Sequence, residues 1–196
     1  MIPSESEMLA AIRLVVSALE SIHVPYLIGG SVASGVYGEP RATRDVDLVA
    51  ALRTGHAGAF AAALGTGFYA HQPAIDEAIT SRRCFNVIHL DTMVKVDVFV
   101  AKEDDFTRSQ FARRSRKQIG QGSPLEACFA SAEDTVLAKL DWYRQGGGVS
   151  DRQWNDVLGV LKVQGPALDL AYLKEWAHRL GLTDPLQQAL DDAGLV

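Results

Sequence analysis

Three aspartates at strand-like positions are the residues of this chain best suited to chemistry. Asp45 and Asp47 alternate with hydrophobic residues in the segment Asp-Val-Asp-Leu, and Asp97 lies between valines in a second alternating segment. Side chains two positions apart on a strand point the same way, so Asp45 and Asp47 project together. Neighbouring carboxylates repel each other unless a cation lies between them, and carboxylate oxygens suit Mg²⁺. If the two strands are neighbours, the pattern predicts a site for two Mg²⁺ ions.

A glycine pair and a serine come before these aspartates. Gly29, Gly30 and Ser31 follow a short hydrophobic strand predicted over 26–28 and open a short helix predicted over 31–37. Glycine lets another group approach the backbone closely, and the amides at a helix start can bind an anion. Ser31 can donate its hydroxyl to a phosphate oxygen or cap the helix. Alone, the glycines suit a turn and the aspartates a solvated strand edge, but the combination favours a phosphate and metal site.

Taken together, Gly29-Gly30-Ser31, Asp45-Val-Asp47-Leu and Asp97 resemble the signature of the polymerase-β-like nucleotidyltransferases. The small bacterial branch described as AbiEii-like or uncharacterised is the most similar, and lincosamide and aminoglycoside nucleotidyltransferases are similar at the same motifs. The resemblance implies an NTP with its phosphates over Gly30 and Ser31, and Mg²⁺ ions bridging the phosphates to the aspartates. It also implies that Asp97 serves the metal nearest the acceptor, whose hydroxyl attacks the α-phosphorus. NMP would be transferred and pyrophosphate released.

A later stretch, 131–156, resembles the C-terminal helical region of the same branch. There the resemblance implies that Lys139 helps to bind the nucleotide and that Asp156 helps to hold the site. The residues alone leave plainer interpretations open. Lys139 suits a surface lysine that lays its stem along the helix, and Asp156 suits an ion pair with Arg152, four positions earlier.

Two arginines just before the aspartate pair are further candidates for nucleotide binding. Arg41 and Arg44 suit the triphosphate or the acceptor, and they equally suit ion pairs with Asp45, Glu39 or other acids. Arg44, adjacent to Asp45, is the one we include among the predicted nucleotide-binding residues.

The elements that must position these residues follow from hydrophobic periodicity and capping residues. Helices are expected over 4–21, 55–64 and 73–80, and strands over 45–50, 68–70, 84–90 and 93–100, the last two as an antiparallel hairpin. Further helices are expected after the capping residues Ser131, Ser150, Asp169 and Thr183. The predicted fold class is α+β (α/β): a nucleotidyltransferase-like mixed sheet flanked by helices, then a C-terminal helical bundle. Residues 1–123 form the predicted α/β core, and residues 124–196 form a helical region packed on it.

Composition limits the class of protein. The 196 residues are 47% hydrophobic and 22% charged, an ordinary globular balance, and the net charge of −5 disfavours a protein that coats nucleic acid. The chain carries two cysteines, Cys84 and Cys128, in no metal-binding pattern, which we expect to be small buried residues of a protein in the reducing cytoplasm. Glu5 and Glu7 stand where a signal peptide would carry positive charge, and no apolar run is long enough to cross a membrane.

The acceptor stays open at this level. A small molecule, a tRNA end or a protein side chain, as in toxin–antitoxin systems, all fit the motifs. Four cations within the five positions 113–117 favour RNA, whereas the acidic net charge disfavours it. The alternative is a catalytically silent nucleotide-binding or toxin–antitoxin interaction module, although all three carboxylates are retained. A phosphohydrolase fits less well because no His/Asp metal pattern is present. The preferred NTP and the oligomeric state are not specified by the sequence.

Overall fold

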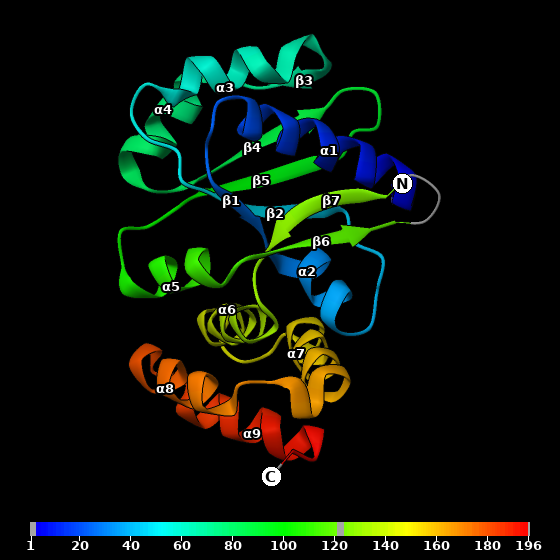
Figure 1. Ribbon diagram of the computed structural model, residues 1–196, viewed down its shortest axis with the longest axis vertical. Coiled ribbons are helices and arrows are strands. Elements are labelled where there is room, and N and C mark those ends of the chain that lie inside the picture. The colour runs from blue at the N-terminus through cyan, green and yellow to red at the C-terminus, as the bar shows by residue number, and fades with distance from the viewer. Residues whose placement is uncertain (1–2, 121–123, 196) are drawn as a thin grey trace. The chain divides into compact units, whose positions relative to one another are not determined.

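The computed structural model describes residues 3–120 and 124–195. The chain divides into two compact units, each built from two segments of sequence. The sheet unit contains Met1–Gly29 and Ala42–Phe129, and the helical unit contains Gly30–Arg41 and Ala130–Val196. Figure 1 labels their helices and strands.

The sheet unit is built on a mixed, seven-stranded sheet with the strand order β3-β4-β5-β2-β1-β7-β6. The pairs β2–β5 and β1–β7 are parallel, and the other pairs are antiparallel. The strands are β1 (Tyr26–Ile28), β2 (Asp45–Ala50), β3 (Phe68–Tyr69), β4 (Cys84–His89), β5 (Lys95–Val100), β6 (Ser115–Ile119) and β7 (Leu125–Phe129).

Four α-helices accompany this sheet among the described residues of the unit: α1 (Glu5–Ser21), α3 (His56–Leu64), α4 (Gln72–Ser81) and α5 (Asp105–Arg113). Helix α1 begins with the predicted capping box. The N–H of Ser4 donates to Glu7 Oε2 at 2.7 Å, and the N–H of Glu7 donates to Ser4 Oγ at 3.3 Å. This reciprocal pair satisfies two N–H groups that the helix itself leaves without a partner.

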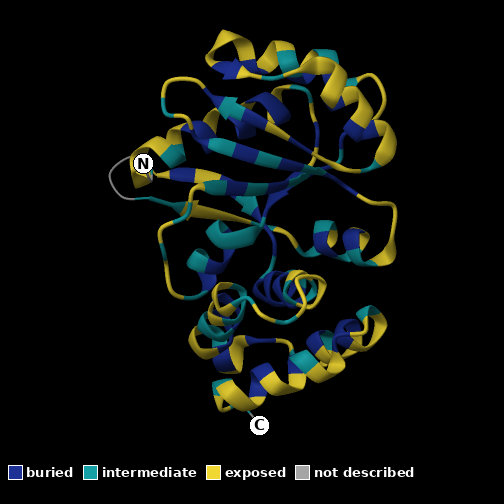
Figure 2. Cartoon of the chain, turned by 180° about the vertical axis from the view of Figure 1, so that it is seen from behind, coloured by how far each residue is buried: buried dark blue, intermediate teal, exposed yellow. Residues whose placement is uncertain are grey.

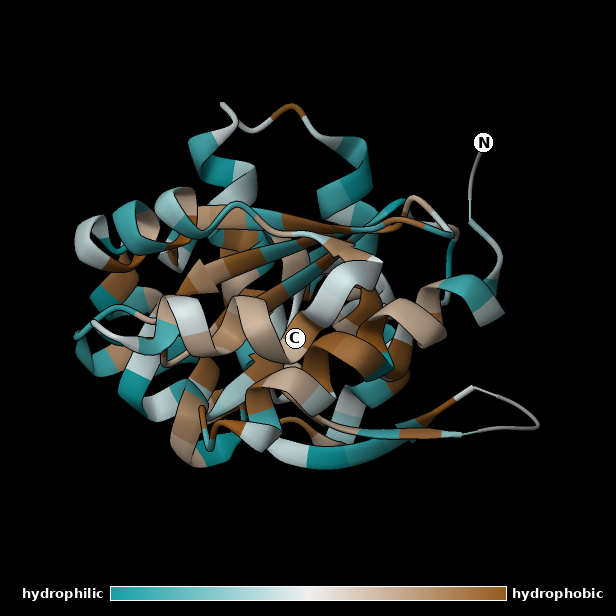
Figure 3. Cartoon of the chain, turned by 90° about the horizontal axis from the view of Figure 1, so that it is seen from above, coloured by the Kyte–Doolittle hydropathy of each residue, from teal (hydrophilic) through white to brown (hydrophobic). Residues whose placement is uncertain are grey.

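The central strands are buried on one face and partly open on the other, as their alternation predicts. Val46, Leu48 and Ala50 of β2 are buried, and so are Val96, Val98 and Val100 of β5. The residues between them are of intermediate exposure, so buried and intermediate colours alternate along the strands in Figure 2. Hydrophobic residues lie on the strands in Figure 3. The partly open face carries all three predicted catalytic aspartates.

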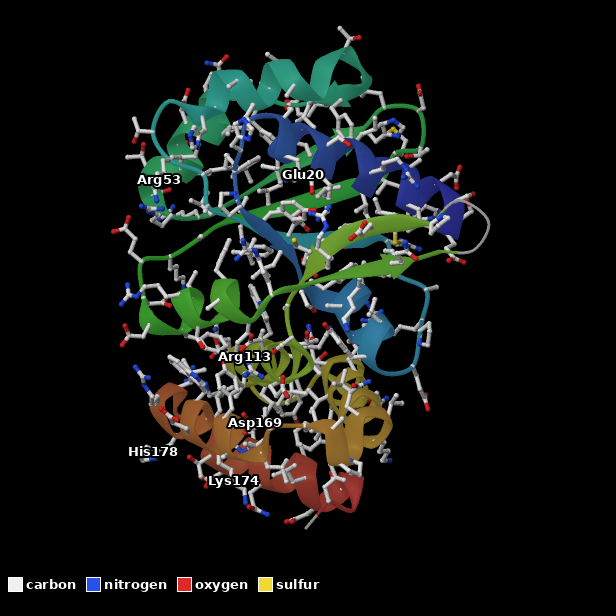
Figure 4. The ribbon with its side chains drawn as sticks, in the orientation of Figure 1. Glu20, Arg53, Arg113, Asp169, Lys174 and His178 are labelled. Carbon is white, nitrogen blue, oxygen red and sulfur yellow. The ribbon has the colours of Figure 1, made fainter. Side chains whose placement is uncertain are left out.

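Helices form the second unit. They are α2 (Gly30–Tyr37), α6 (Ala132–Gln145), α7 (Asp151–Gln164), α8 (Leu170–Leu180) and α9 (Thr183–Ala193). Helix α2 packs on α6 and α7, and Gln164 Nε2 donates to the carbonyl of Tyr37 at 2.7 Å. Ser131, Ser150 and Asp169 cap α6, α7 and α8 as predicted, and Figure 4 labels Asp169 at the start of α8. Thr183 instead begins α9 inside the helix, with Leu182 at the cap position.

The predicted α+β class with a mixed sheet is confirmed, but several elements differ from the prediction. Strands β6 and β7 and helix α5 were not predicted. Three of the five residues of β6 are exposed, so this edge strand lacks the hydrophobic alternation that identifies a strand in a sequence. Among the described helices, none is long and apolar enough to cross a membrane.

The boundaries of the two units differ from those of the predicted domains. The predicted boundary after residue 123 falls at the end of 121–123, outside the described residues. Strand β7 follows it and belongs to the sheet unit, because β7 pairs with both β1 and β6. Helix α2 lies well before this predicted boundary in the sequence. It nevertheless belongs to the helical unit, because α2 packs on α6 and α7.

Candidate functional site

The three aspartates lie on one face of two neighbouring strands. Strands β2 and β5 are parallel, with Asp47 opposite Asp97 and Asp45 opposite Lys95. Residues paired in this way point to the same face, and adjacent strands are about 4.8 Å apart. The structure therefore brings Asp45, Asp47 and Asp97 together, as expected if their strands were neighbours.

Lys95 is a member of this cluster that the sequence interpretation missed. Its Nζ atom lies 2.8 Å from Asp97 Oδ2 and 3.5 Å from Asp45 Oδ1. The hydrogen bond to Asp97 is the main reason that the pKa of Lys95 is raised above its ordinary value, against a smaller effect of burial. A signal was present in the sequence: Lys95 stands two positions before Asp97, so both side chains share a face of the strand.

The donor set of this cluster fits a divalent metal in type but does not form a finished cage. Three carboxylates on one face are hard oxygen ligands of the kind that Mg²⁺ prefers, and Mg²⁺ usually takes few ligands from the protein. In residues 3–120 and 124–195, no three His, Cys, Asp or Glu side chains converge as a metal-binding group. The ammonium of Lys95 instead bridges Asp45 and Asp97.

Strand β4 extends the same face on the other side of β5. Asn86 stands opposite Asp97, and Cys84 lies two positions away. Cys84 is exposed rather than buried, contrary to the expectation from the sequence. Local desolvation, and then the charges of Asp97 and Asp47, raise the pKa of its thiol to about 11. A cavity of about 430 Å³ lies beside β4; residues of α4 form much of its wall, and β4 contributes Cys84, Phe85 and Asn86 but the aspartates do not line it.

Gly29, the first glycine of the pair, contacts the central aspartate. The N–H of Gly29 donates to the carbonyl of Asp47 at 2.9 Å. Gly30 begins α2 with a φ of +56°, in the left-handed region that favours glycine. A Cβ atom added at Gly29 would meet nothing within 4 Å. The space next to Gly29 is thus open, as a close approach of a ligand to the backbone requires.

In the helical unit, a buried ionic network is centred on Asp156. Arg41 donates to both of its carboxylate oxygens, from Nε at 2.7 Å and from Nη2 at 2.8 Å. Lys139 Nζ donates to Asp156 Oδ2 at 2.6 Å and to Gln153 Oε1 at 3.1 Å. Arg41 Nη2 also donates to Ser31 Oγ at 2.5 Å. Three of the predicted nucleotide-binding residues, Ser31, Lys139 and Asp156, are therefore joined in one network through Arg41.

Burial and charge act in opposite directions on Asp156. The side chains of Asp156 and Lys139 are both only 4% exposed. Burial by itself raises the pKa of Asp156, but the hydrogen bonds and charges of Arg41 and Lys139 together hold it below its ordinary value. The carboxylate is thus kept ionised as the common partner of two cations.

This network decides between several interpretations of the sequence. Lys139 is buried rather than spread along the surface, and the recorded partners of Asp156 are Arg41 and Lys139 rather than Arg152. Arg41 contacts Ser31, whereas Arg44 lies exposed in the loop before β2. The sequence interpretation thus included Arg44 and left out Arg41, the arginine that the structure joins to the other candidates.

The basic run at 113–117 does not form an open patch of unpaired charge. Arg116, on the edge strand β6, forms ion pairs with Glu20 at 3.3 Å and with Glu126 at 3.1 Å. Figure 4 labels Glu20 near the end of α1 and Arg113 at the end of α5. Part of the positive charge in the run is therefore already neutralised within the sheet unit.

No protein-family model and no curated protein sequence matches this chain. Solved structures do match it. An antigenic nucleotidyltransferase-like protein from Paracoccidioides brasiliensis is similar with a TM-score of 0.50 and 17% identity, over 96% of this chain and 94% of that one. The solution structure of the antibiotic-resistance factor ANT(2'')-Ia is similar with a TM-score of 0.56 and 12% identity, over 94% of this chain and 99% of that one.

A crystal structure of ANT(2'')-Ia in complex with adenylyl-2''-tobramycin is similar with a TM-score of 0.53 and 13% identity, over 88% of this chain and 95% of that one. At such identities the likeness concerns the fold, and it extends over most of both chains. The protein therefore has the fold of nucleotidyltransferase-like proteins.

Proposed function

We propose that the protein is a Mg²⁺-dependent nucleotidyltransferase that moves NMP from an NTP to an acceptor hydroxyl and releases pyrophosphate. One observation carries the proposal: Asp45, Asp47 and Asp97 share one face of adjacent parallel strands, and the N–H of Gly29, the first residue of the Gly-Gly-Ser segment, donates to the carbonyl of Asp47. Carboxylates for metal and backbone amides for phosphate are the two requirements of nucleotidyl transfer, which depends mainly on positioning and charge neutralisation.

Asp45, Asp47 and Asp97 are the residues that would hold the metal. When bound, Mg²⁺ supplies the positive charge that neutralises the phosphates and stabilises the attacking and leaving oxygens. Asp97 accepts the proton of the acceptor hydroxyl as the new bond to the α-phosphorus forms, and the bond to pyrophosphate breaks. This assignment is supported by the register, which pairs Asp97 with Asp47.

The phosphates are assigned to the residues around Ser31. Gly29 and Gly30 leave the backbone open to a close approach, and Ser31 offers a hydroxyl. Arg41 and Lys139 supply positive charge, and Asp156 positions both cations through the hydrogen bonds described above. Arg41, with its contact to Ser31, is better supported for this role than Arg44.

A small molecule is the acceptor that the observations favour over RNA. ANT(2'')-Ia, which has a similar fold, has been solved with adenylyl-2''-tobramycin. The basic strand β6 gives RNA less support because Arg116 is paired with two glutamates.

A label-transfer experiment tests the proposal. The purified protein is incubated with Mg²⁺ and each NTP labelled at the α-phosphate, together with total tRNA, a cell lysate, or a panel of aminoglycosides and lincosamides. We expect label on one class of acceptor, and none with the Asp47→Asn variant. Asp91→Asn, in an exposed turn of the same unit, is the matched control. Bound nucleotide without any transfer, across all acceptors, would favour the silent binding module instead.

A further inference from the structure

We propose that Lys95 is a built-in counter-ion of the metal site, which holds the carboxylates together when no metal is bound and competes with a free divalent cation. The inference rests on the proposed function, since it takes the three aspartates as the metal ligands. It adds a residue that none of the sequence motifs includes.

The contacts of Lys95 are those of a cation held between carboxylates. Its ammonium lies 2.8 Å from Asp97 Oδ2 and 3.5 Å from Asp45 Oδ1, so one positive charge bridges two of the three acids. These two carboxylates stand on different strands, and Lys95 stands opposite Asp45 in the register. The ammonium thus occupies a position where a divalent cation would also gain two carboxylate oxygens.

The contact of Lys95 offsets electrostatic repulsion among the aspartates. Three carboxylates on one face repel each other, and a positive charge among them lowers the free energy of the folded chain. A lysine ammonium is a compact charge on a flexible stem, so it can leave as a whole without moving the strand. The side chain of Lys95 is 38% exposed, which gives it a path into solvent, whereas Asp97 is only 18% exposed.

Competition follows from this arrangement. A metal that binds Asp45 and Asp97 has to displace the ammonium, so the loss of the two ion-pair contacts reduces its binding free energy. A free Mg²⁺ ion has only the protein and water as ligands, so this loss lowers its affinity fully. A Mg²⁺ ion that arrives with a nucleotide brings phosphate oxygens and depends on fewer protein ligands. Lys95 therefore biases the site toward the metal–nucleotide complex over the free ion.

The test measures metal binding without any nucleotide or acceptor. Mg²⁺ and Mn²⁺ are titrated into the wild type and into Lys95→Met, which keeps the length of the stem but removes its charge, and binding is followed by calorimetry and by thermal unfolding. We expect Lys95→Met to bind Mg²⁺ about five- to tenfold more tightly than the wild type. We also expect its metal-free form to unfold at a lower temperature and to regain the difference when Mg²⁺ is added.

Two further variants make the result specific. Lys95→Arg keeps a charge at this position and should retain the weaker affinity of the wild type. Lys102→Met removes an exposed lysine of the same unit and should change neither the affinity nor the metal-free unfolding temperature. Circular dichroism of every variant verifies the fold, and Lys95→Gln provides a second neutral side chain if Lys95→Met does not fold.

The outcomes separate the inference from the proposed function. If the wild type and Lys95→Met bind Mg²⁺ with equal affinity, the proposed function stands and the role of Lys95 is overturned. If neither protein binds Mg²⁺ or Mn²⁺, the role of Lys95 as a competitor of the free ion is overturned, and the label-transfer experiment alone decides the proposed function.

Discussion

Asp47 and Asp97 stand opposite each other on the parallel strands β2 and β5, which places two carboxylates at neighbouring positions of one sheet face. Two like charges at this spacing oppose folding unless a cation compensates them. Lys95 compensates Asp97 directly, through its contact at 2.8 Å. Carboxylates gathered on one face so closely that they need a cation beside them are typical of a functional site rather than of a structural one.

Asp47→Asn should abolish nucleotidyl transfer and leave the fold intact. The amide keeps the shape of the side chain but is a far weaker metal ligand, and its loss of charge relieves repulsion with Asp97. We expect a loss of at least about 100-fold in rate, comparable to removal of one electrostatic stabiliser from an active site. Label transfer measures it, with circular dichroism and thermal unfolding to verify the fold. Near-wild-type transfer would contradict the assignment of Asp47 as a metal ligand.

Substitutions at Gly29 and Gly30 should have different effects. Gly30 has a φ of +56°, so Gly30→Ala should lower the free energy of unfolding by about 1–2 kcal/mol. Gly29 has open space around it, so Gly29→Ala should leave unfolding unchanged and instead raise the KM for NTP, because the added methyl fills the path of the phosphates. Urea unfolding and steady-state kinetics measure the two effects. Unchanged KM in Gly29→Ala would show that the phosphates do not approach there.

The two clusters differ in how far the sequence could reveal them. The aspartates lie on strands whose valines alternate, so their common face was predictable from local spacing. Whether the two strands are neighbours was left open, because β2 and β5 pair across an intervening stretch that holds two α-helices and two further strands. Arg41 and Asp156 are 115 positions apart, and nothing local distinguishes Arg41 from Arg44. Only the fold, which carries α2 into the helical unit, identifies Arg41 as the partner of Asp156 and Ser31.

Asp156→Ala should strongly destabilise the helical unit. Lys139 is 4% exposed, so removal of the Asp156 carboxylate takes away the negative charge that offsets a buried ammonium. We expect a loss of about 3–5 kcal/mol in the free energy of unfolding. Replacing both partners, as Asp156→Leu with Lys139→Met, should restore much of it. Urea unfolding followed by tryptophan fluorescence measures the change in this unit, because all three tryptophans, Trp142, Trp154 and Trp176, lie in its helices. A loss below 1 kcal/mol would contradict a buried pair.

The same carboxylate should make the stability of the helical unit depend on acid pH. The pKa of Asp156 is lowered in the folded chain, so the unfolded chain binds a proton more readily. The contribution of Asp156 is therefore fully present above its unfolded pKa, near 4, and is lost as the pH falls through the folded pKa. We expect the difference in unfolding free energy between wild type and Asp156→Asn to be constant above pH about 5 and to shrink below about 4. A difference that grows on acidification would contradict the sign of this shift.

Cys84 offers a probe of the acidic face that needs neither nucleotide nor acceptor. Local desolvation, then Asp97 and Asp47, raise the pKa of its thiol to about 11 from an ordinary value of 9.0, although the residue is exposed. In a Cys128→Ser background, iodoacetamide at pH 8 should therefore alkylate Cys84 about 100-fold more slowly than a free cysteine, because the thiolate fraction falls by that factor.

Since the carboxylate charges contribute to the shift, Asp97→Asn should accelerate the reaction. Mg²⁺ bound to the aspartates should accelerate it as well, by offsetting the same charges, and should have no effect on the Asp97→Asn protein if that variant no longer binds the metal. An alkylation rate that matches free cysteine, in the wild type without metal, would contradict the raised pKa, and a rate unchanged by Asp97→Asn would contradict the contribution of that carboxylate.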